Sequence, residues 1–250
     1  SLSLREQYDR GVAALSKKWT VERCIPYLQA HTNTYAPLEV LRPMFEEARA
    51  QDGVVGMNIA TRADCLEDGT VTYLAELAER TTLTVELGLQ SAHDSTAQLI
   101  NRGHSYADFV DGYRKLRSAS EKINICVHII FGLPDETDEM ILETVRKVAE
   151  LKPEQVKIHL LHVLASSRLG KIYLDGGYKP LERERYIDLV VRALELLPPK
   201  TVVARLTGDG MSEDLLAPEW SRKKVSVIND VDKLMFERNT WQGRCYSPKT

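Results

Sequence analysis

Hydrophobic and polar positions along the chain follow two periods. Short runs rich in branched and aromatic residues, typical of strands, alternate with longer stretches that carry apolar residues at helical spacing. The expected strands are Ile25–His31, Val54–Thr61, Leu83–Gln90, Ile123–Phe131, Val156–Val163 and Val202–Thr207. The expected helices are Leu4–Trp19, Leu38–Ala50, Thr70–Glu79, Ser95–Ile100, Tyr106–Ser118, Asp138–Glu150, Arg168–Ile172 and Glu182–Leu197. This alternation predicts βαβ units and a parallel sheet.

The chain is expected to form one α/β domain. Prolines and glycines fall at the expected breaks, and no repeat, linker or low-complexity segment interrupts the alternation. We therefore predict a parallel partial (β/α)6-type barrel at residues 25–217. An N-terminal helix at residues 1–24 precedes it, and a C-terminal helical extension at residues 218–250 follows it.

Each expected strand has two faces, and one of them carries mainly polar side chains. Residues two apart in a strand share a face, and the polar set comprises Gln29, His31, Asn58, Arg62, Glu86, Gln90, His128, Lys157, His159, Arg205 and Thr207. The opposite parity is mostly apolar, whereas an ordinary barrel interior is packed with branched apolar side chains. An ion pair between Glu86 and Lys157 would account for the burial of two residues of this polar set. Because burying so many polar groups is unfavourable, the whole set favours an open barrel built around a ligand.

Composition and charge are those of an ordinary globular protein. Hydrophobic residues make up 43% and charged residues 28% of the 250 residues, and the net charge is −3. No apolar run is long enough to span a membrane and no signal peptide is visible, so a cytoplasmic enzyme is expected. The region from Pro218 onward is locally basic, which is more often a solvated helix face than an RNA contact.

The four cysteines are scattered. Cys24, Cys65, Cys126 and Cys245 form no C-x-x-C or similar cluster, so they indicate neither a zinc site nor a disulfide framework. Each is most simply a small buried apolar residue or a surface thiol.

Two segments resemble radical S-adenosylmethionine (SAM) enzymes. They are ELGLQSAHDSTAQLINRGHS from Glu86 to Ser105 and HIIFGLPDET from His128 to Thr137. In this order they are similar to the branch around oxygen-independent coproporphyrinogen oxidase and the elongator-type tRNA modifiers, including a bacterial group without an assigned substrate. HTNTYAP from His31 and ATRADCL from Ala60 extend the resemblance to almost the whole chain.

The resemblance implies SAM contacts at the carboxyl ends of the strands, where α/β folds bind ligands. Thr32, Asn33 and Thr34 stand where relatives have a Gly-Gly-Glu-type turn that holds the methionine amino group, although an ordinary polar turn is equally compatible. Gln90 would present its amide to SAM. Arg102 would hold the methionine carboxylate in a bidentate fork, with a surface arginine as the alternative.

Further contacts implied by the resemblance lie in the next strand. His128 would bond the ribose hydroxyls, or would be a core histidine with its own partner. Ile130, Phe131 and Gly132 would line the adenine through main-chain contacts and apolar packing. In the ATRADCL segment we expect a local ion pair between Arg62 and Asp64, and by parity His159, His162 and Arg205 would face the substrate.

The cluster chemistry of the family is not encoded in this chain. The resemblance implies a [4Fe-4S] cluster held by a C-x3-C-x2-C motif, which is missing here, so we predict no metal ligand and name no catalytic residue. The opening helix resembles the one that follows the cluster loop. We therefore expect the first βα unit to be missing and this fragment to be inactive, a natural relative without a cluster being the alternative.

The expected partners follow from the same resemblance. They are SAM, an external electron donor and a substrate that is either a small molecule or tRNA, and the exposed barrel edge is expected to favour dimer formation. Two other functions stay open at this point. One is an unrelated β/α-barrel enzyme, and the other is a degenerate barrel that acts as a binding module.

Overall fold

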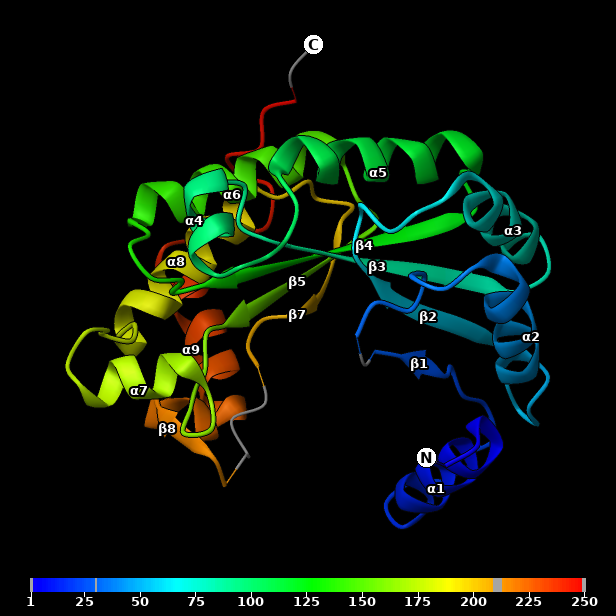
Figure 1. Cartoon of the computed structure of the whole chain (residues 1–250). Helices are drawn as coiled ribbons and strands as arrows, with labels where there is room; N and C mark the ends of the chain where they lie inside the picture. The colour runs from blue at the N-terminus through cyan, green and yellow to red at the C-terminus, as the bar shows by residue number, and fades with distance from the viewer. Residues whose placement is uncertain (1, 30, 209–212, 249–250) are drawn as a thin grey trace. The chain divides into compact units, whose positions relative to one another are not determined.

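The computed structural model describes residues 2–29, 31–208 and 213–248 (Figure 1). By internal contacts the chain divides into two compact units, Ser1–Gly88 with Ala107–Cys126 and Leu89–Tyr106 with Val127–Thr250, and each is considered by itself.

The strands confirm the predicted parallel α/β fold. Six of them form one sheet in the order β1-β2-β3-β4-β5-β7, and β6 pairs with β8 in a separate antiparallel pair. Their bounds are β1 (Tyr27–Leu28), β2 (Gly56–Thr61), β3 (Thr82–Gln90), β4 (Ile123–Phe131), β5 (Gln155–Leu160), β6 (Val163–Leu164), β7 (Val202–Arg205) and β8 (Leu215–Ala217).

The helices follow the expected stretches closely. Their bounds are α1 (Leu4–Ser16), α2 (Leu38–Arg49), α3 (Asp68–Ala78), α4 (Asp94–Leu99), α5 (Tyr106–Ala119), α6 (Asp138–Leu151), α7 (Arg168–Leu174), α8 (Arg183–Leu196), the 3-10 helix η1 (Glu219–Arg222) and α9 (Lys224–Glu237). The last two make up the predicted C-terminal helical extension. Within the described ranges, no helix combines the length and the apolar character that crossing a lipid bilayer requires.

In the first unit, α2, α3 and α5 pack around β2 and the start of β3. Phe45 of α2 stacks on Tyr73 of α3 with ring centroids 6.3 Å apart, and both side chains are buried. Gly112 lets α5 approach the loop after β2, because a Cβ at this position would lie 2.2 Å from the Ala63 carbonyl oxygen. The core of this unit therefore lies between the helices and one face of its strands.

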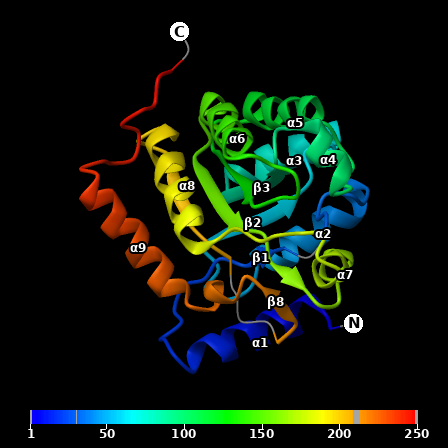
Figure 2. The same ribbon diagram turned by 90° about the vertical axis from the view of Figure 1, so that its left-hand side faces the viewer.

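In the second unit, α6, α8 and α9 lie side by side in both views (Figures 1 and 2). Phe131 at the end of β4 meets Tyr186 of α8 edge to face, with centroids 6.1 Å apart. Burial raises the pKa of Tyr186, whose hydroxyl donates to the Leu206 carbonyl at 2.6 Å. One face of β4 thus packs against α8.

Two parts of the strand prediction differ from the structure. β1 spans two residues instead of the predicted Ile25–His31, of which residue 30 lies outside the described residues. Pro26 has no N–H to donate, and His31 has a left-handed φ of 63° that ends the extended backbone. The predicted strand Val156–Val163 ends at Leu160, and its last residue begins β6. The pairing of β6 with β8 was not predicted, because strands of two and three residues leave no periodic signal.

A charge network joins the ends of α2 and α3. The Glu46 carboxylate accepts hydrogen bonds from Arg80 at 2.5 Å, Tyr73 at 2.8 Å and Arg49 at 3.1 Å. The Arg80 guanidinium, with help from Tyr73 and Arg49, lowers the pKa of Glu46 to about 2 from its usual 4.5. Glu46 therefore stabilises the folded chain as an anion.

Glu46→Gln is expected to lower the free energy of unfolding at pH 7 by about 1 kcal/mol, since the network is partly exposed. The folded pKa lies below the unfolded one, so the contribution is complete above pH 4.5 and disappears as the pH falls towards 2. Urea unfolding at several pH values measures this. Glu47→Gln on the exposed face of α2 is the control, and a difference that persists at pH 2 would contradict the assignment.

Candidate functional site

In the second unit, β5 and the last part of β4 each have one buried and one half-buried face, as the sequence predicts. In β5 the side chains of Val156, Ile158 and Leu160 are buried, while Lys157 and His159 between them are half-buried. In the part of β4 that belongs to this unit, from Val127 to Phe131, the half-buried positions are His128 and Ile130. The His128 and His159 rings lie 5.1 Å apart. We call the face that carries Lys157, His159, His128 and Ile130 the polar face.

In the first unit the polar parity of β3 carries a buried acid. Glu86 is 1% exposed, and its carboxylate accepts hydrogen bonds from the Tyr27 hydroxyl at 2.8 Å and the Asn58 amide at 3.2 Å. Within the first unit, neutral donors from β1 and β2 bind this carboxylate.

The turn after β3 is held by a buried cation. Gln90 ends the strand with a left-handed φ of 60°. Arg102 donates through Nη1 to the carbonyls of Leu89, at 2.6 Å, and Ser91, and through Nε and Nη2 to the His104 carbonyl at 2.9 and 2.8 Å. The Arg102 side chain is 3% exposed. Its guanidinium therefore fixes the backbone on both sides of Gln90.

Main-chain carbonyls take up most of the hydrogen-bonding capacity of Arg102. Each of its three guanidinium nitrogens donates to a main-chain carbonyl, and the Asp94 carboxylate lies 3.6 Å from Nη2. A bidentate fork to a ligand carboxylate would have to replace these bonds. We therefore assign Arg102 as a positioning residue for Gln90. Sequence spacing brings the two residues together correctly but does not reveal which atoms they contact.

The G-L-P-x-E-T segment, residues 132–137, is hydrogen-bonded to the turn after β3. The Ser91 hydroxyl donates to the Glu136 carboxylate at 2.5 Å. Burial raises the pKa of Glu136, and hydrogen bonds from Ser91 and Thr96 oppose the shift only in part. Thr137 caps α6 by accepting from the Met140 amide at 3.3 Å. Sequence reasoning missed Ser91 and Glu136 as interacting residues, although both belong to the motifs that signalled the family.

Phe131 and Gly132 serve packing in this structure. The Phe131 ring faces α8, and its carbonyl accepts from the Leu161 amide at 2.9 Å. Gly132 has a φ of 88°, and a Cβ there would lie 3.2 Å from the Leu181 side chain. Burial raises the pKa of Tyr178 to about 12, and its hydroxyl donates to the Gly132 carbonyl at 2.6 Å. Of the three residues expected to line adenine, Ile130 alone has its side chain on the polar face.

The turn at Thr32–Thr34 belongs to the first unit and joins strand ends. The buried Thr34 hydroxyl lies 2.6 Å from that of Thr61. The Asn33 amide donates at 3.0 and 2.8 Å to two carbonyls, those of Leu28 and Ala60. These contacts support the alternative of an ordinary polar turn for Asn33 and Thr34. Thr32 is half-buried beside them.

The ion pair expected in the ATRADCL segment is confirmed. Arg62 donates to the Asp64 carboxylate at 2.9 Å through Nε and at 2.6 Å through Nη2. The Asp64 carboxylate raises the pKa of Arg62 further above its usual value. The pair thus stabilises the loop that follows β2.

The cysteines do not fit the ligand set of an iron–sulfur cluster. All four are free thiols: Cys24 lies 2.7 Å from the Tyr8 hydroxyl, Cys126 is buried in β4, Cys245 is exposed, and burial raises the pKa of Cys65. Among the residues that the structure describes, no three cysteines lie within ligand distance of one another.

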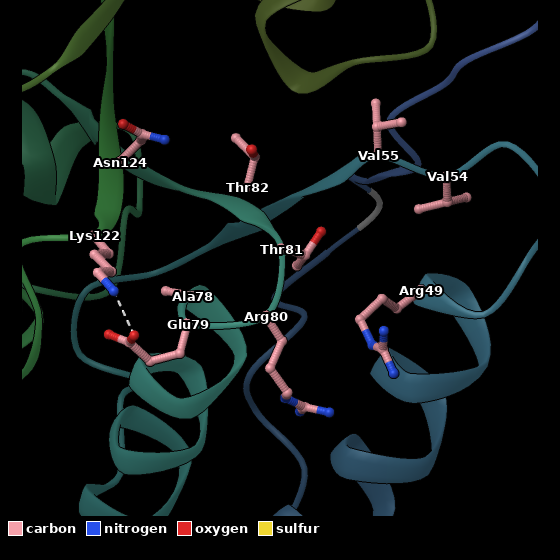
Figure 3. Close-up of a pocket in the computed structure, with 10 residues that line it drawn as sticks. All are labelled: Arg49, Val54, Val55, Ala78, Glu79, Arg80, Thr81, Thr82, Lys122 and Asn124. Atoms are coloured by element: carbon pink, nitrogen blue, oxygen red, sulfur yellow. Dashed lines mark hydrogen bonds and ion pairs between the residues drawn. The ribbon is translucent and has the colours of Figure 1, made fainter.

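A hollow of about 640 Å³ lies at the amino ends of the strands in the first unit. It is lined by ten residues at the ends of α2 and α3, before β2 and around the starts of β3 and β4 (Figure 3). Lys122 binds Glu79 at 2.5 Å, while Arg49 and Arg80 bind Glu46. These cations are neutralised by carboxylates and lie at helix C-termini, which favour positive charge. The hollow is therefore structural.

A six-stranded parallel sheet flanked by helices, with a polar face and a braced turn at a strand end, defines a protein of the partial β/α-barrel type. Comparison with protein families makes this specific. The chain belongs to the radical SAM superfamily, whose model matches residues 5–148, and the Radical_SAM C-terminal domain matches residues 153–237. This membership excludes the unrelated β/α-barrel enzyme that the sequence left open.

Individual relatives agree with this assignment. The chain is 47% identical to the uncharacterized protein YtqA of Bacillus subtilis, over 93% of this chain and 71% of that protein. It is 34% identical to the uncharacterized protein MJ0486 of Methanocaldococcus jannaschii, over 97% and 75% of the two chains. The structure of archaeal Methanocaldococcus infernus Elp3 has the same fold, with a TM-score of 0.78 at 20% identity, and this chain spans 59% of it.

Arg102→Met is expected to lower the free energy of unfolding by about 3 kcal/mol, because buried carbonyls lose their donor. Urea unfolding measures the change, and Arg146→Met, which removes an exposed ion pair with Glu139, should cost less than about 1 kcal/mol. Equal effects of the two substitutions would contradict a bracing role for Arg102.

Incubation of this chain with iron and sulfide under reducing, anaerobic conditions is expected to leave it without a [4Fe-4S] cluster, because its four thiols lie in unrelated surroundings. Iron and sulfide analysis together with absorbance spectroscopy tests this. A stoichiometric cluster signal would overturn the conclusion that the ligands do not fit.

Proposed function

We propose that this chain is the SAM-binding core of a radical SAM enzyme. In this superfamily a [4Fe-4S] cluster supplies the electron that cleaves SAM reductively, after which hydrogen is abstracted from the substrate. The cysteines of this chain do not form such a ligand set, so the proposal assigns to it the binding and orientation of SAM. The cluster and an external electron donor are needed in addition.

The braced turn at Gln90 carries the proposal. A non-glycine residue in the left-handed region costs about 1–3 kcal/mol, and such residues cluster at ligand sites. Here Arg102 holds the carbonyls on both sides of Gln90, so contacts within the chain stabilise the strained backbone. Fixing the backbone also limits where the half-buried Gln90 amide can point, and this reduces the entropic cost of binding.

The polar face supplies the other proposed contacts of the second unit. Ile130 offers an apolar side chain for the adenine ring, and His128 offers one ring nitrogen to the ribose hydroxyls. Phe131 and Gly132 act through the shape of the turn that they stabilise. Gln90 would bind a polar group of the methionine part, and its amide can both donate and accept.

Isothermal titration calorimetry of the 250-residue chain with SAM tests the proposal. We expect measurable binding that Gln90→Ala weakens about tenfold, or about 1.4 kcal/mol. Gln98→Ala, on the exposed side of α4, should leave the affinity unchanged. An absence of SAM binding, or equal binding by both variants, would contradict the proposal and favour a degenerate barrel that serves as a binding module.

A further inference from the structure

We propose that Glu136 is a positioning residue for Gln90 and that it acts through the Ser91 hydroxyl. This inference rests on the proposed function, because it concerns the same SAM site. It adds a residue that lies outside the strand carrying Gln90, in the segment between β4 and α6. All the residues concerned belong to the second unit.

Gln90 is the central residue of a three-residue γ-turn. The Ser91 amide donates to the Leu89 carbonyl at 2.7 Å, and Gln90 between them has a φ of 60°. A γ-turn with a positive φ at its centre is the rarer and more strained of the two forms. A side chain on such a turn keeps its direction only while both neighbouring residues are held. Arg102 holds their carbonyls, and the Ser91 side chain has a separate partner.

The Ser91 side chain connects this turn to Glu136. Ser91 is completely buried, and its hydroxyl donates to the Glu136 carboxylate at 2.5 Å and accepts from the His93 amide at 3.1 Å. A hydroxyl has a single proton to donate, so the bond to Glu136 fixes its rotation and turns a lone pair towards His93. Glu136 therefore determines where the residue that closes the γ-turn lies.

Glu136 stands at the end of a second strained turn. Its amide donates to the Leu133 carbonyl at 3.3 Å, and Asp135 in between has a left-handed φ of 63°. Pro134 followed by a left-handed residue is the pattern of a type II β-turn. Left-handed residues other than glycine cost free energy and cluster at ligand sites. The bond between Ser91 and Glu136 thus joins two strained turns.

The residue after Ser91 has its own anchor. The Ala92 amide donates to the Thr144 hydroxyl of α6 at 3.1 Å. Loss of the Glu136 carboxylate would therefore release Ser91 while Ala92 stays attached to α6. The effect should reach Gln90 without unfolding the unit.

Calorimetric titration of the 250-residue chain with SAM tests this role. We expect Glu136→Ala to weaken binding about fivefold, less than the loss of the Gln90 amide itself, because the amide remains but is no longer held in place. Glu136→Gln keeps an oxygen that accepts from Ser91 and removes a charge that burial disfavours, so it should restore the affinity to within about twofold. Thr137→Ala, which removes the N-cap of α6, is the control: it should lower the stability and leave the affinity unchanged.

A double-mutant cycle tests whether Glu136 acts through Gln90. In a chain that already carries Gln90→Ala, the further change Glu136→Ala should alter the SAM affinity by less than about twofold, because the amide that it positions is gone. Additive losses would overturn the proposal. Equal weakening by Glu136→Ala and Thr137→Ala, or equal weakening by Glu136→Ala and Glu136→Gln, would overturn it as well.

Hydrogen exchange separates this outcome from that of the proposed function. Without SAM, exchange of the Ser91 amide followed by NMR should be about tenfold faster in Glu136→Ala and unchanged in Thr137→Ala. If no form of the chain binds SAM but exchange responds in this way, the proposed function fails and the positioning of the turn stands. If SAM binds and neither exchange nor affinity responds to Glu136→Ala, the proposed function stands and the positioning role fails.

Discussion

The buried guanidinium of Arg102 is the constraint on which the candidate site depends. A cation taken out of water is costly unless acceptors surround it, and here the acceptors are main-chain carbonyls on both sides of Gln90 and at His104. The same bonds that compensate the charge therefore determine the backbone geometry. The left-handed conformation of Gln90 is a consequence of this arrangement, since nothing in a glutamine side chain favours it.

Because side chains alternate along a strand, the two faces of β4 differ in what they contact. The parity that buries Phe131 against Tyr186 necessarily turns His128 and Ile130 the other way. The first face supplies packing energy, and the second is the face for which we propose ligand contacts. A one-residue slip of β4 would exchange the two sets, placing His128 against α8 and leaving Phe131 on the polar face, so burial of the apolar set also fixes the register of the polar one.

The order of strands and helices could be predicted from the sequence because long periodic segments such as Ile123–Phe131 and Asp138–Leu151 carry a strong signal. Motif spacing likewise located the turn at Gln90. The roles of Arg102, Asn33 and Thr34 could not be predicted in this way. A guanidinium, an amide or a hydroxyl suits a ligand and a carbonyl equally well, and the choice depends on which acceptor the folded backbone brings within 3 Å.

The motif residues that signal the family therefore hold the backbone more than they hold the ligand. Ser91 binds Glu136, Thr137 caps α6, and Arg102 clamps the carbonyls around Gln90. Such residues explain why a signature can identify the superfamily without indicating a substrate: they build the shared turn.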